Sequence, residues 1–198
     1  MRGIHANDQQ AEVGRAGQRC ALNLAGAEVR KDKVQRGQWA VNASAHLATQ
    51  RLDARIRVPA NADKPLAHWT PVHLHLGTQD VTARLALLEA DTIEPGESGL
   101  VRVMPNRPMA AWVGDRFIIR DQSARRTIGG GEVLDAHPPV RGRARPERLQ
   151  VLKATRSIAP AKAFAALAES QPQGVEIDTF QRGWNMADGQ IEAVLNAA

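Results

Sequence analysis

Apolar and polar residues alternate along much of the first 140 residues of the chain. In the segments 52–58 and 71–76, every second position is apolar, and charged residues, histidine or proline stand between them. This period of two is typical of strands with one buried face. We predict further strands at 18–24, 39–41, 81–88, 100–104 and 117–120. Short strands separated by turn residues are the pattern of a β-barrel or a β-sandwich.

The pattern becomes helical beyond residue 146. Pro146 opens a segment with Leu149 and Leu152 at helical spacing, and Pro160 opens an alanine-rich segment. Proline fits the first turn of a helix, where its missing N–H costs nothing. Shorter helices are expected over 178–184 and 189–197. Four short helices in this region indicate a helix-turn-helix or winged-helix module.

These patterns predict a mainly β chain that ends in a small α-helical segment. A first β region covers 1–45, and a break in the alternation follows it. The segment 50–138 has the length of one small β-barrel and ends at a pair of prolines. A basic linker, 139–146, then leads to a partial winged-helix domain over 147–198.

The composition favours a nucleic-acid partner. Lys and Arg total 26 against 21 acidic residues, which gives a net charge of +5. Aromatic residues make up only 4% of the chain, so an extended base-stacking surface is disfavoured, and recognition of a folded RNA backbone fits better. Cys20 is the single cysteine, which excludes a disulfide framework and suits a cytoplasmic protein. No apolar run reaches membrane-spanning length, so no membrane association is expected.

The sequence contains no recognisable catalytic or cofactor-binding motif. A phosphate-binding loop and a nucleophile elbow are both missing. His73 and His75 share one face of a predicted strand, but no third metal ligand stands near them in the sequence. We therefore expect surface histidines, no metal site and no enzyme activity of this chain.

The segment 120–134 carries the strongest candidate chemistry. Arg120 ends a predicted strand, and Arg125, Arg126 and Thr127 then precede three glycines, Gly129, Gly130 and Gly131. Arginine binds phosphate through a planar fork of donors, and glycine lets a backbone approach a ligand closely. A basic glycine turn on a β-scaffold can therefore contact nucleic acid. The same residues also suit a tight β-turn without a ligand, and the pattern leaves both interpretations open.

Arg19 is a second candidate for anion binding. It follows a predicted turn at Ala16-Gly17 and begins a segment of alternating apolar residues. Its guanidinium either faces solvent from the strand or contacts an anion at the rim of a barrel. The pattern alone favours the solvent-facing arginine.

Three motifs in the first 40 residues together resemble a known protein family. They are Arg-Gly-Ile-His-Ala at 2–6, Ala-Gly-Gln-Arg followed by an alternating strand at 16–26, and Gln-Arg-Gly-Gln-Trp at 35–39. Their order is similar to the second half of domain II of translational GTPases, and their details resemble the selenocysteine-specific elongation factors (SelB). Residues 50–137 resemble domain III of that family, and 146–198 resemble the start of its C-terminal winged-helix array.

The resemblance implies a function in delivering selenocysteyl-tRNA to the ribosome at UGA codons. It implies that Arg19 lines the selenocysteyl pocket and that Arg120, Arg125, Arg126, Thr127 and Gly129–Gly131 contact the tRNA. The family binds GTP and Mg²⁺ in a GTPase domain, whose motifs this chain lacks, so no cofactor is expected here. The family binds the hairpin of the selenoprotein messenger through terminal winged helices, which we also expect to be missing.

This resemblance leads us to expect a fragment of a selenocysteine-specific elongation factor. Three alternatives stay open. A DNA-binding winged-helix regulator would need a basic recognition helix, yet the segment 189–197 has no Lys or Arg. An inactive gene fragment would bind no tRNA selectively. Another translational GTPase is the third alternative, and the Ala-Gly-Gln-Arg motif separates it from the selenocysteine-specific factors.

Overall fold

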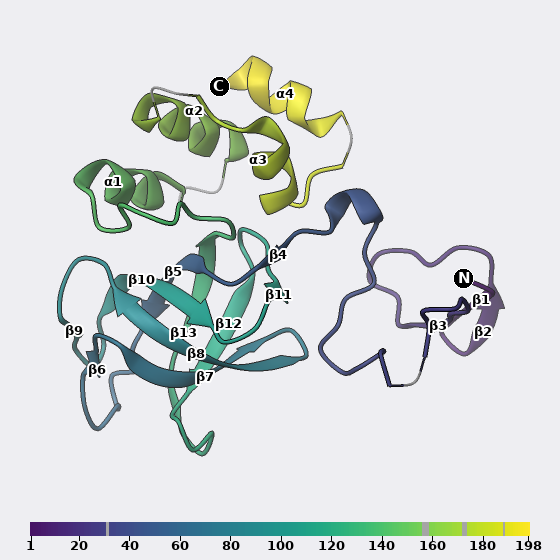
Figure 1. The fold of residues 1–198 in the computed structure, drawn as a ribbon, viewed down its shortest axis with the longest axis horizontal. Coiled ribbons are helices and arrows are strands. Elements are labelled where there is room, and N and C mark those ends of the chain that lie inside the picture. The colour runs from purple at the N-terminus through teal and green to yellow at the C-terminus, as the bar shows by residue number, and fades with distance from the viewer. Residues whose placement is uncertain (31, 156–158, 172–173, 188) are drawn as a thin grey trace. The chain divides into compact units, whose positions relative to one another are not determined.

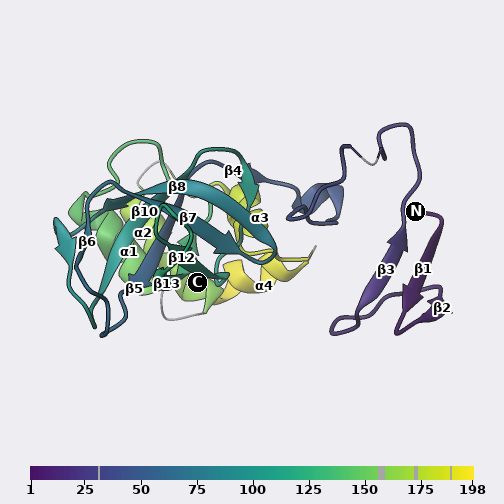
Figure 2. The same cartoon turned by 90° about the horizontal axis from the view of Figure 1, so that it is seen from below.

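The computed structural model describes residues 1–30, 32–155, 159–171, 174–187 and 189–198. By its contacts the chain divides into two compact units, Met1–Gln38 and Trp39–Ala198. The first unit holds a small β-sheet. The second holds a closed β-barrel and four helices, which lie together on one side of the barrel (Figures 1 and 2).

The first unit is a three-stranded antiparallel sheet in the order β2-β1-β3. Its strands are β1 (Gly3–Ala6), β2 (Gln9–Ala11) and β3 (Cys20–Asn23). Asn7 and Asp8 join β1 to β2 with φ values of 51° and 64°, which a primed hairpin turn requires and Asn and Asp tolerate. The predicted turn at Ala16-Gly17 is confirmed, with φ of 85° at Gly17, and the following strand is confirmed in shortened form.

The predicted strand at 39–41 is wrong. Residues 39–41 pair with no strand, and Trp39 instead packs on Trp112 and on the turn at Gly77, all within the second unit. Its ring lies edge to face with Trp112, with ring centres 5.4 Å apart, and a Cβ on Gly77 would be 2.9 Å from Trp39 Cζ2. An aromatic ring that packs on a turn needs no ladder of backbone hydrogen bonds, so the alternating pattern misled the prediction here.

The barrel is confirmed as predicted, with six antiparallel strands in the order β10-β5-β13-β12-β7-β8 (Figure 1). They are β5 (Leu52–Arg57), β7 (Thr70–Leu76), β8 (Gln79–Leu87), β10 (Ser98–Pro105), β12 (Arg116–Arg120) and β13 (Thr127–Asp135). Two short pairs add to its periphery: β4 (Ala48–Thr49) with β11 (Met109–Ala110), and β6 (Leu66–Ala67) with β9 (Thr92–Ile93).

Alternation along the strands fills the barrel interior. The largest fully buried side chains of the barrel are aliphatic and come from alternate positions: Leu52, Ile56, Val72, Leu74, Leu76, Leu85, Val101, Val103, Ile119 and Val133. Burial of apolar area is the main favourable contribution to folding. The barrel therefore has a continuous hydrophobic core of its own, as the period of two predicts.

The helices are α1 (Pro146–Thr155), α2 (Pro160–Ser170), α3 (Ile177–Gly183) and α4 (Gln190–Ala197). The predicted proline starts of α1 and α2 are confirmed. Leu152 of α1 packs against Leu88, Leu100 and Leu134 of the barrel side, which joins helix to barrel. Phe180 of α3 lies edge to face with Phe164 of α2, with ring centres 5.1 Å apart.

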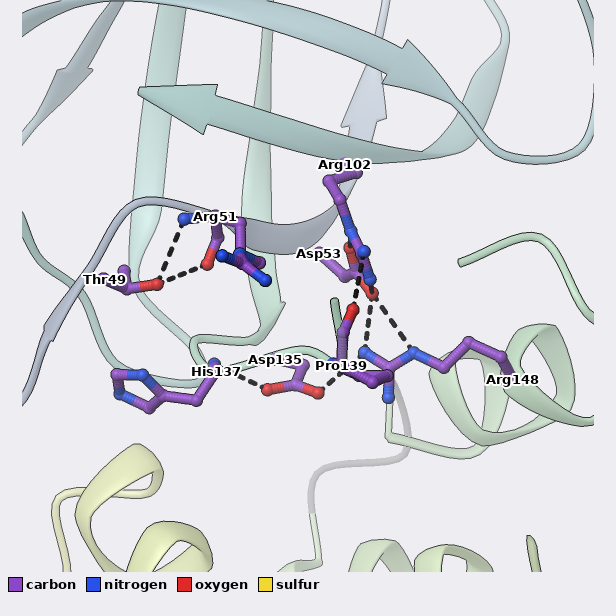
Figure 3. A network of polar contacts seen from close by, with 8 residues as sticks. All are labelled: Thr49, Arg51, Asp53, Arg102, Asp135, His137, Pro139 and Arg148. Atoms are coloured by element: carbon purple, nitrogen blue, oxygen red, sulfur yellow. Dashed lines mark hydrogen bonds and ion pairs between the residues drawn. The ribbon is translucent and has the colours of Figure 1, made fainter. Parts of the chain in front are cut away.

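A buried ion cluster also joins α1 to the barrel (Figure 3). Asp53 of β5 is fully buried and accepts hydrogen bonds from Arg102 of β10 at 2.7 and 2.9 Å. Arg148 of α1 donates to the same carboxylate at 2.6 and 3.1 Å and to Asp135 Oδ2 at 2.7 Å. Arg102 also donates to the Pro139 carbonyl at 2.7 Å. Two arginines and two carboxylates balance each other there, as buried charges require.

Candidate nucleic-acid interface

The loop between β12 and β13 presents the predicted arginines, and Asp121 organises it. The Asp121 carboxylate accepts hydrogen bonds from the backbone N–H groups of Arg125 at 2.9 Å and Arg126 at 3.3 Å, and from the Ser123 hydroxyl at 3.0 Å. Asp121 N–H donates to the Arg126 carbonyl at 2.9 Å, which closes the loop. A side chain that bonds its own backbone a few residues on is typical of Asx turns. The loop is therefore preformed.

The guanidinium groups of the three arginines differ in whether another group of the protein already binds them. Arg120 donates to the Ala124 carbonyl at 3.1 Å, and Arg126 forms an ion pair and hydrogen bond with Asp63. Arg125 is exposed, and its side chain has no hydrogen bond or ion pair with any described residue. The Arg125 guanidinium is therefore the freest of the three to bind an external anion.

The Arg126–Asp63 pair affects the ionisation of both groups. The hydrogen bond from Arg126, and then its charge, hold the pKa of Asp63 below its usual range. The same contacts raise the pKa of Arg126. At Asp121, desolvation raises the pKa, but the backbone hydrogen bonds from Arg126 and Arg125 outweigh it and lower the pKa overall. Both carboxylates are thus ionised at neutral pH, and they moderate the positive charge of the loop.

A groove of about 520 Å³ lies between this loop and the segment 59–67. Arg126, Thr127 and Asp121 line its one side, and Asp63 and Lys64 line the other. Thr127 is exposed at the start of β13 and also lines the groove. Basic side chains on both walls give the groove the donors that a phosphate backbone needs.

The predicted glycine turn at 129–131 is wrong. All three lie within β13, where they pair with β12 and β5. A Cβ on Gly131 would lie 2.1 Å from the Arg55 carbonyl oxygen, and one on Gly129 would lie 3.1 Å from the Arg57 carbonyl oxygen. A Cβ on Gly130 would lie 3.1 Å from the Phe117 carbonyl oxygen. Close approach of neighbouring backbones therefore explains the glycines without a ligand.

Comparisons with known proteins identify this barrel. Residues 53–140 match the family described as "Selenocysteine-specific elongation factor, beta-barrel domain". The chain is 32% identical over 188 residues to a selenocysteine-specific elongation factor of Escherichia coli K12, which is 95% of this chain and 27% of that protein. It is 34% identical over 135 residues to one of Desulfomicrobium baculatum, which is 68% of this chain and 21% of that protein. The chain belongs to the family of selenocysteine-specific elongation factors.

A solved structure agrees with this assignment at the level of the fold. A crystal structure of a bacterial selenocysteine-specific elongation factor, EF-Sec, superposes with a TM-score of 0.70 at 19% identity and covers 94% of this chain. The chain covers 28% of that structure, and it spans about a quarter of the length of the curated relatives. The family match therefore applies to the barrel and its neighbouring segments.

Arg19, which the elongation-factor resemblance assigns to the selenocysteyl pocket, lies in the first unit. Its side chain is 86% exposed and stands 3.6 Å from Asp8 Oδ1 in a weak surface ion pair. It follows the turn in which Gln18 N–H donates to the Arg15 carbonyl at 3.1 Å. Within its own unit, the Arg19 side chain thus lies in solvent, where it is available to a ligand.

His73 and His75 of β7 both face Asp80, whose pKa is lowered first by the hydrogen bond from His73 Nδ1 at 3.0 Å. No set of three or more His, Cys, Asp or Glu among the described residues is arranged to hold a metal ion. In the same part of the chain no helix is long and apolar enough to cross a membrane.

The acidic partners of the interface, Asp63 and Asp121, could not both be recognised from the sequence. Asp63 stands 63 residues from Arg126 in the chain, so no local pattern could connect the two. Asp121, by contrast, has a local signal, because an Asp followed two residues later by Ser is typical of a self-bonded turn. The barrel of this chain thus presents a preformed basic loop whose positive charge Asp63 and Asp121 partly offset.

Proposed function

We propose that this chain supplies tRNA-binding parts of a factor that delivers selenocysteyl-tRNA to the ribosome in the cytoplasm for selenocysteine incorporation at UGA codons. The observation that carries the proposal is the free Arg125 guanidinium on a preformed loop of the family-matched barrel. The chain itself does no catalysis. GTP and Mg²⁺ bind to the GTPase domain of such a factor, and the messenger hairpin binds to its terminal winged helices.

The loop suits the phosphate backbone of a folded RNA. Arginine binds phosphate through two parallel hydrogen bonds, which fix both distance and orientation. Because Asp121 already holds the backbone around Arg125, binding costs little additional ordering of the loop. Arg120 and Arg126 flank it in the chain, and Lys64 lines the same groove as Arg126. We assign Arg125 as the leading phosphate contact, with Arg120, Arg126 and Thr127 as its neighbours.

Arg19 would contribute recognition of the amino acid on the tRNA. A selenol ionises far more readily than a serine hydroxyl, and a guanidinium stabilises the resulting anion. The exposed position of Arg19, with only a 3.6 Å contact to Asp8, leaves it available for this role. The discrimination against seryl-tRNA would then be electrostatic.

Binding of tRNA by Arg125→Gln tests the proposal. The probes are selenocysteine tRNA and a standard elongator tRNA, measured at several salt concentrations. We expect Arg125→Gln to weaken binding of selenocysteine tRNA at least about tenfold and to lower the salt slope by about one unit, because one phosphate contact is lost. Arg116→Gln, which removes the same charge at the opposite end of β12, is the matched control.

Two results would contradict the proposal. Equal binding of both tRNAs by the unchanged chain would show that only nonspecific charge attraction is present. Arg125→Gln and Arg116→Gln with the same affinity and the same salt slope would show that the loop contacts no phosphate. Circular dichroism of each variant establishes that the barrel is folded in both cases.

A further inference from the structure

Trp69 combines a strained backbone with an exposed ring. It stands between β6 and β7 with φ of 62°, in the left-handed region that a bulky side chain rarely adopts. Its side chain stays exposed, with 42% of the residue's surface open to solvent. Burial therefore does not fully compensate for the strain. Residues held in such a conformation cluster at sites of function, where the fold holds them in place.

The surroundings of the Trp69 ring are basic. The guanidinium carbon of Arg143, in the linker 139–146, lies 5.7 Å from the ring centre, within the range of a cation–π contact. Arg84 Nη1 donates to the Trp69 carbonyl at 3.5 Å. The part of the chain that the structure describes places no carboxylate in an ion pair with Arg84 or Arg143. Both cations are thus left to attract an anionic ligand beside the ring.

His68 holds the ring in place from one side. The two rings lie edge to face, with centres 5.5 Å apart and planes at 88°. His68 Nδ1 accepts the Leu87 N–H at 3.1 Å, which fixes the orientation of the imidazole and leaves the ring proton on Nε2. A fixed imidazole packed perpendicular to the indole limits the ways in which the indole can turn, so its open surface is preorganised.

The site continues the interface proposed above. Trp69 stands in the chain between Ala67 and Thr70, and both of these residues line the groove beneath Arg126. An RNA strand whose phosphates lie along that groove would therefore pass beside the segment that carries Trp69. This continuity and the charge of the surroundings both favour RNA as the ligand.

We infer that Trp69 stacks an unpaired nucleobase of RNA, with Arg84 and Arg143 attracting the phosphates on either side of that base. The inference rests on the proposed function, because it takes the groove beside Trp69 as an RNA surface. Base stacking on an aromatic ring needs no sequence-specific hydrogen bonds, and arginine adds a cation–π contribution. The low aromatic content of the chain argues against an extended stacking surface but is compatible with a single position.

Three RNA octamers of equal charge test the inference on the full chain: oligoadenylate, oligouridylate and an abasic ribose-phosphate chain. Stacking predicts that oligoadenylate binds about 5- to 150-fold more tightly than the abasic chain. Trp69→Leu should abolish this difference and leave the salt slope unchanged, and Trp69→Phe should retain most of it. Trp39→Leu is the matched control, because Trp39 is also exposed, at 47%, and lies elsewhere on the unit.

If Trp69→Leu binds oligoadenylate as tightly as the unchanged chain, the inference is overturned. A melting temperature lowered in Trp69→Leu, with RNA affinity unchanged, would mean that the ring only fastens the linker to the barrel. Trp69→Phe, which keeps a ring of similar shape, guards against a variant that fails to fold.

The two proposals fail in distinguishable ways. Loss of the adenylate preference in Trp69→Leu, together with a normal tRNA affinity and salt slope in Arg125→Gln, supports stacking and refutes the tRNA contact of the loop. The reverse pattern refutes stacking and leaves the loop contact standing. Each variant is therefore measured with both the octamers and selenocysteine tRNA.

Discussion

Arg148 of the first helix and Asp53 of the barrel form a buried ion pair, with Arg148 Nη2 2.6 Å from Asp53 Oδ2. Asp53 is fully buried and also holds Arg102 of the neighbouring strand. Burial lowers the pKa of Arg148, but Asp135 and Asp53 outweigh it and raise that pKa. The helix is therefore attached to the barrel by a permanent charge as well as by the packing of Leu152.

Removing the Asp53 charge should strongly destabilise the second unit. Asp53→Asn leaves the guanidinium groups of Arg102 and Arg148 buried with one carboxylate too few. We expect a loss of about 3–5 kcal/mol in the free energy of unfolding, measured by urea denaturation. Asp91→Asn, at an exposed position, is the matched control and should change stability by less than about 0.5 kcal/mol. An Asp53→Asn protein as stable as the control would show that the cluster is dispensable.

Gly131 gives a second prediction, on barrel packing. A Cβ on Gly131 would be 2.1 Å from the Arg55 carbonyl oxygen and 2.8 Å from Phe117 Cζ, so backbone must move to admit it. We expect Gly131→Ala to cost about 3 kcal/mol or more in unfolding free energy. Gly130→Ala, whose Cβ would meet its nearest atom at 3.1 Å, should cost clearly less. Similar melting temperatures for the two variants would contradict the packing role of Gly131.

The strands of the barrel could be predicted because their signal is local. Alternation over 52–58 and 71–76 fixes which side chains face inward, and the observed strands β5 and β7 follow it closely. The glycines of β13 could not be read in the same way. A glycine run after arginines is equally typical of a turn, and only the neighbouring strand, with the Arg55 carbonyl, decides between the two.

The partners of charged side chains could not be predicted either, when they lie far away in the sequence. Alternation places Asp53 on the polar face of its strand, which is correct, yet the side chain is fully buried because α1 covers that face. Likewise, Arg126 is recognisable as a candidate from its neighbours, but its pairing with Asp63 depends on a distant loop. Sequence patterns thus predicted which residues carry the charge, and the fold determines which charges are free.

His137 gives a prediction on pH. It is half-buried beside a cavity of about 230 Å³ between the barrel and the helices, and burial lowers its pKa below 6.5, although Asp135 opposes the shift. The unfolded chain therefore binds the proton more readily. The contribution of His137 to stability is complete above about pH 6.5. It is lost as the pH falls through the lowered pKa of the folded state.

The variant His137→Gln should accordingly unfold with a weaker pH dependence than the unchanged chain over the range from about pH 7 to 5. Urea denaturation at several pH values measures this difference. His46→Gln, which changes an exposed histidine, is the control and should leave the pH dependence as it is. Identical pH profiles for His137→Gln and the unchanged chain would show that His137 titrates alike in the folded and unfolded states.

Asp63 limits the charge that the proposed RNA surface offers, and this gives the last prediction. It pairs with Arg126, and its pKa is lowered by that contact, so it is ionised at neutral pH. An RNA phosphate that binds Arg126 must displace this carboxylate. Exposed ion pairs are weak, so Asp63→Asn should strengthen RNA binding by no more than about fivefold.

Release of Arg126 should also make the salt dependence of RNA binding steeper, by up to about one unit of slope. Asp91→Asn removes the same charge from an exposed position and isolates the effect of net charge alone. If Asp63→Asn and Asp91→Asn bind selenocysteine tRNA with equal affinity and slope, Arg126 meets no phosphate. The double variant Arg125→Gln with Asp63→Asn shows whether the two arginines bind the same phosphate. If they do, the double variant should lose less RNA affinity than Arg125→Gln alone, because Arg126 is then released from Asp63 and can bind the phosphate.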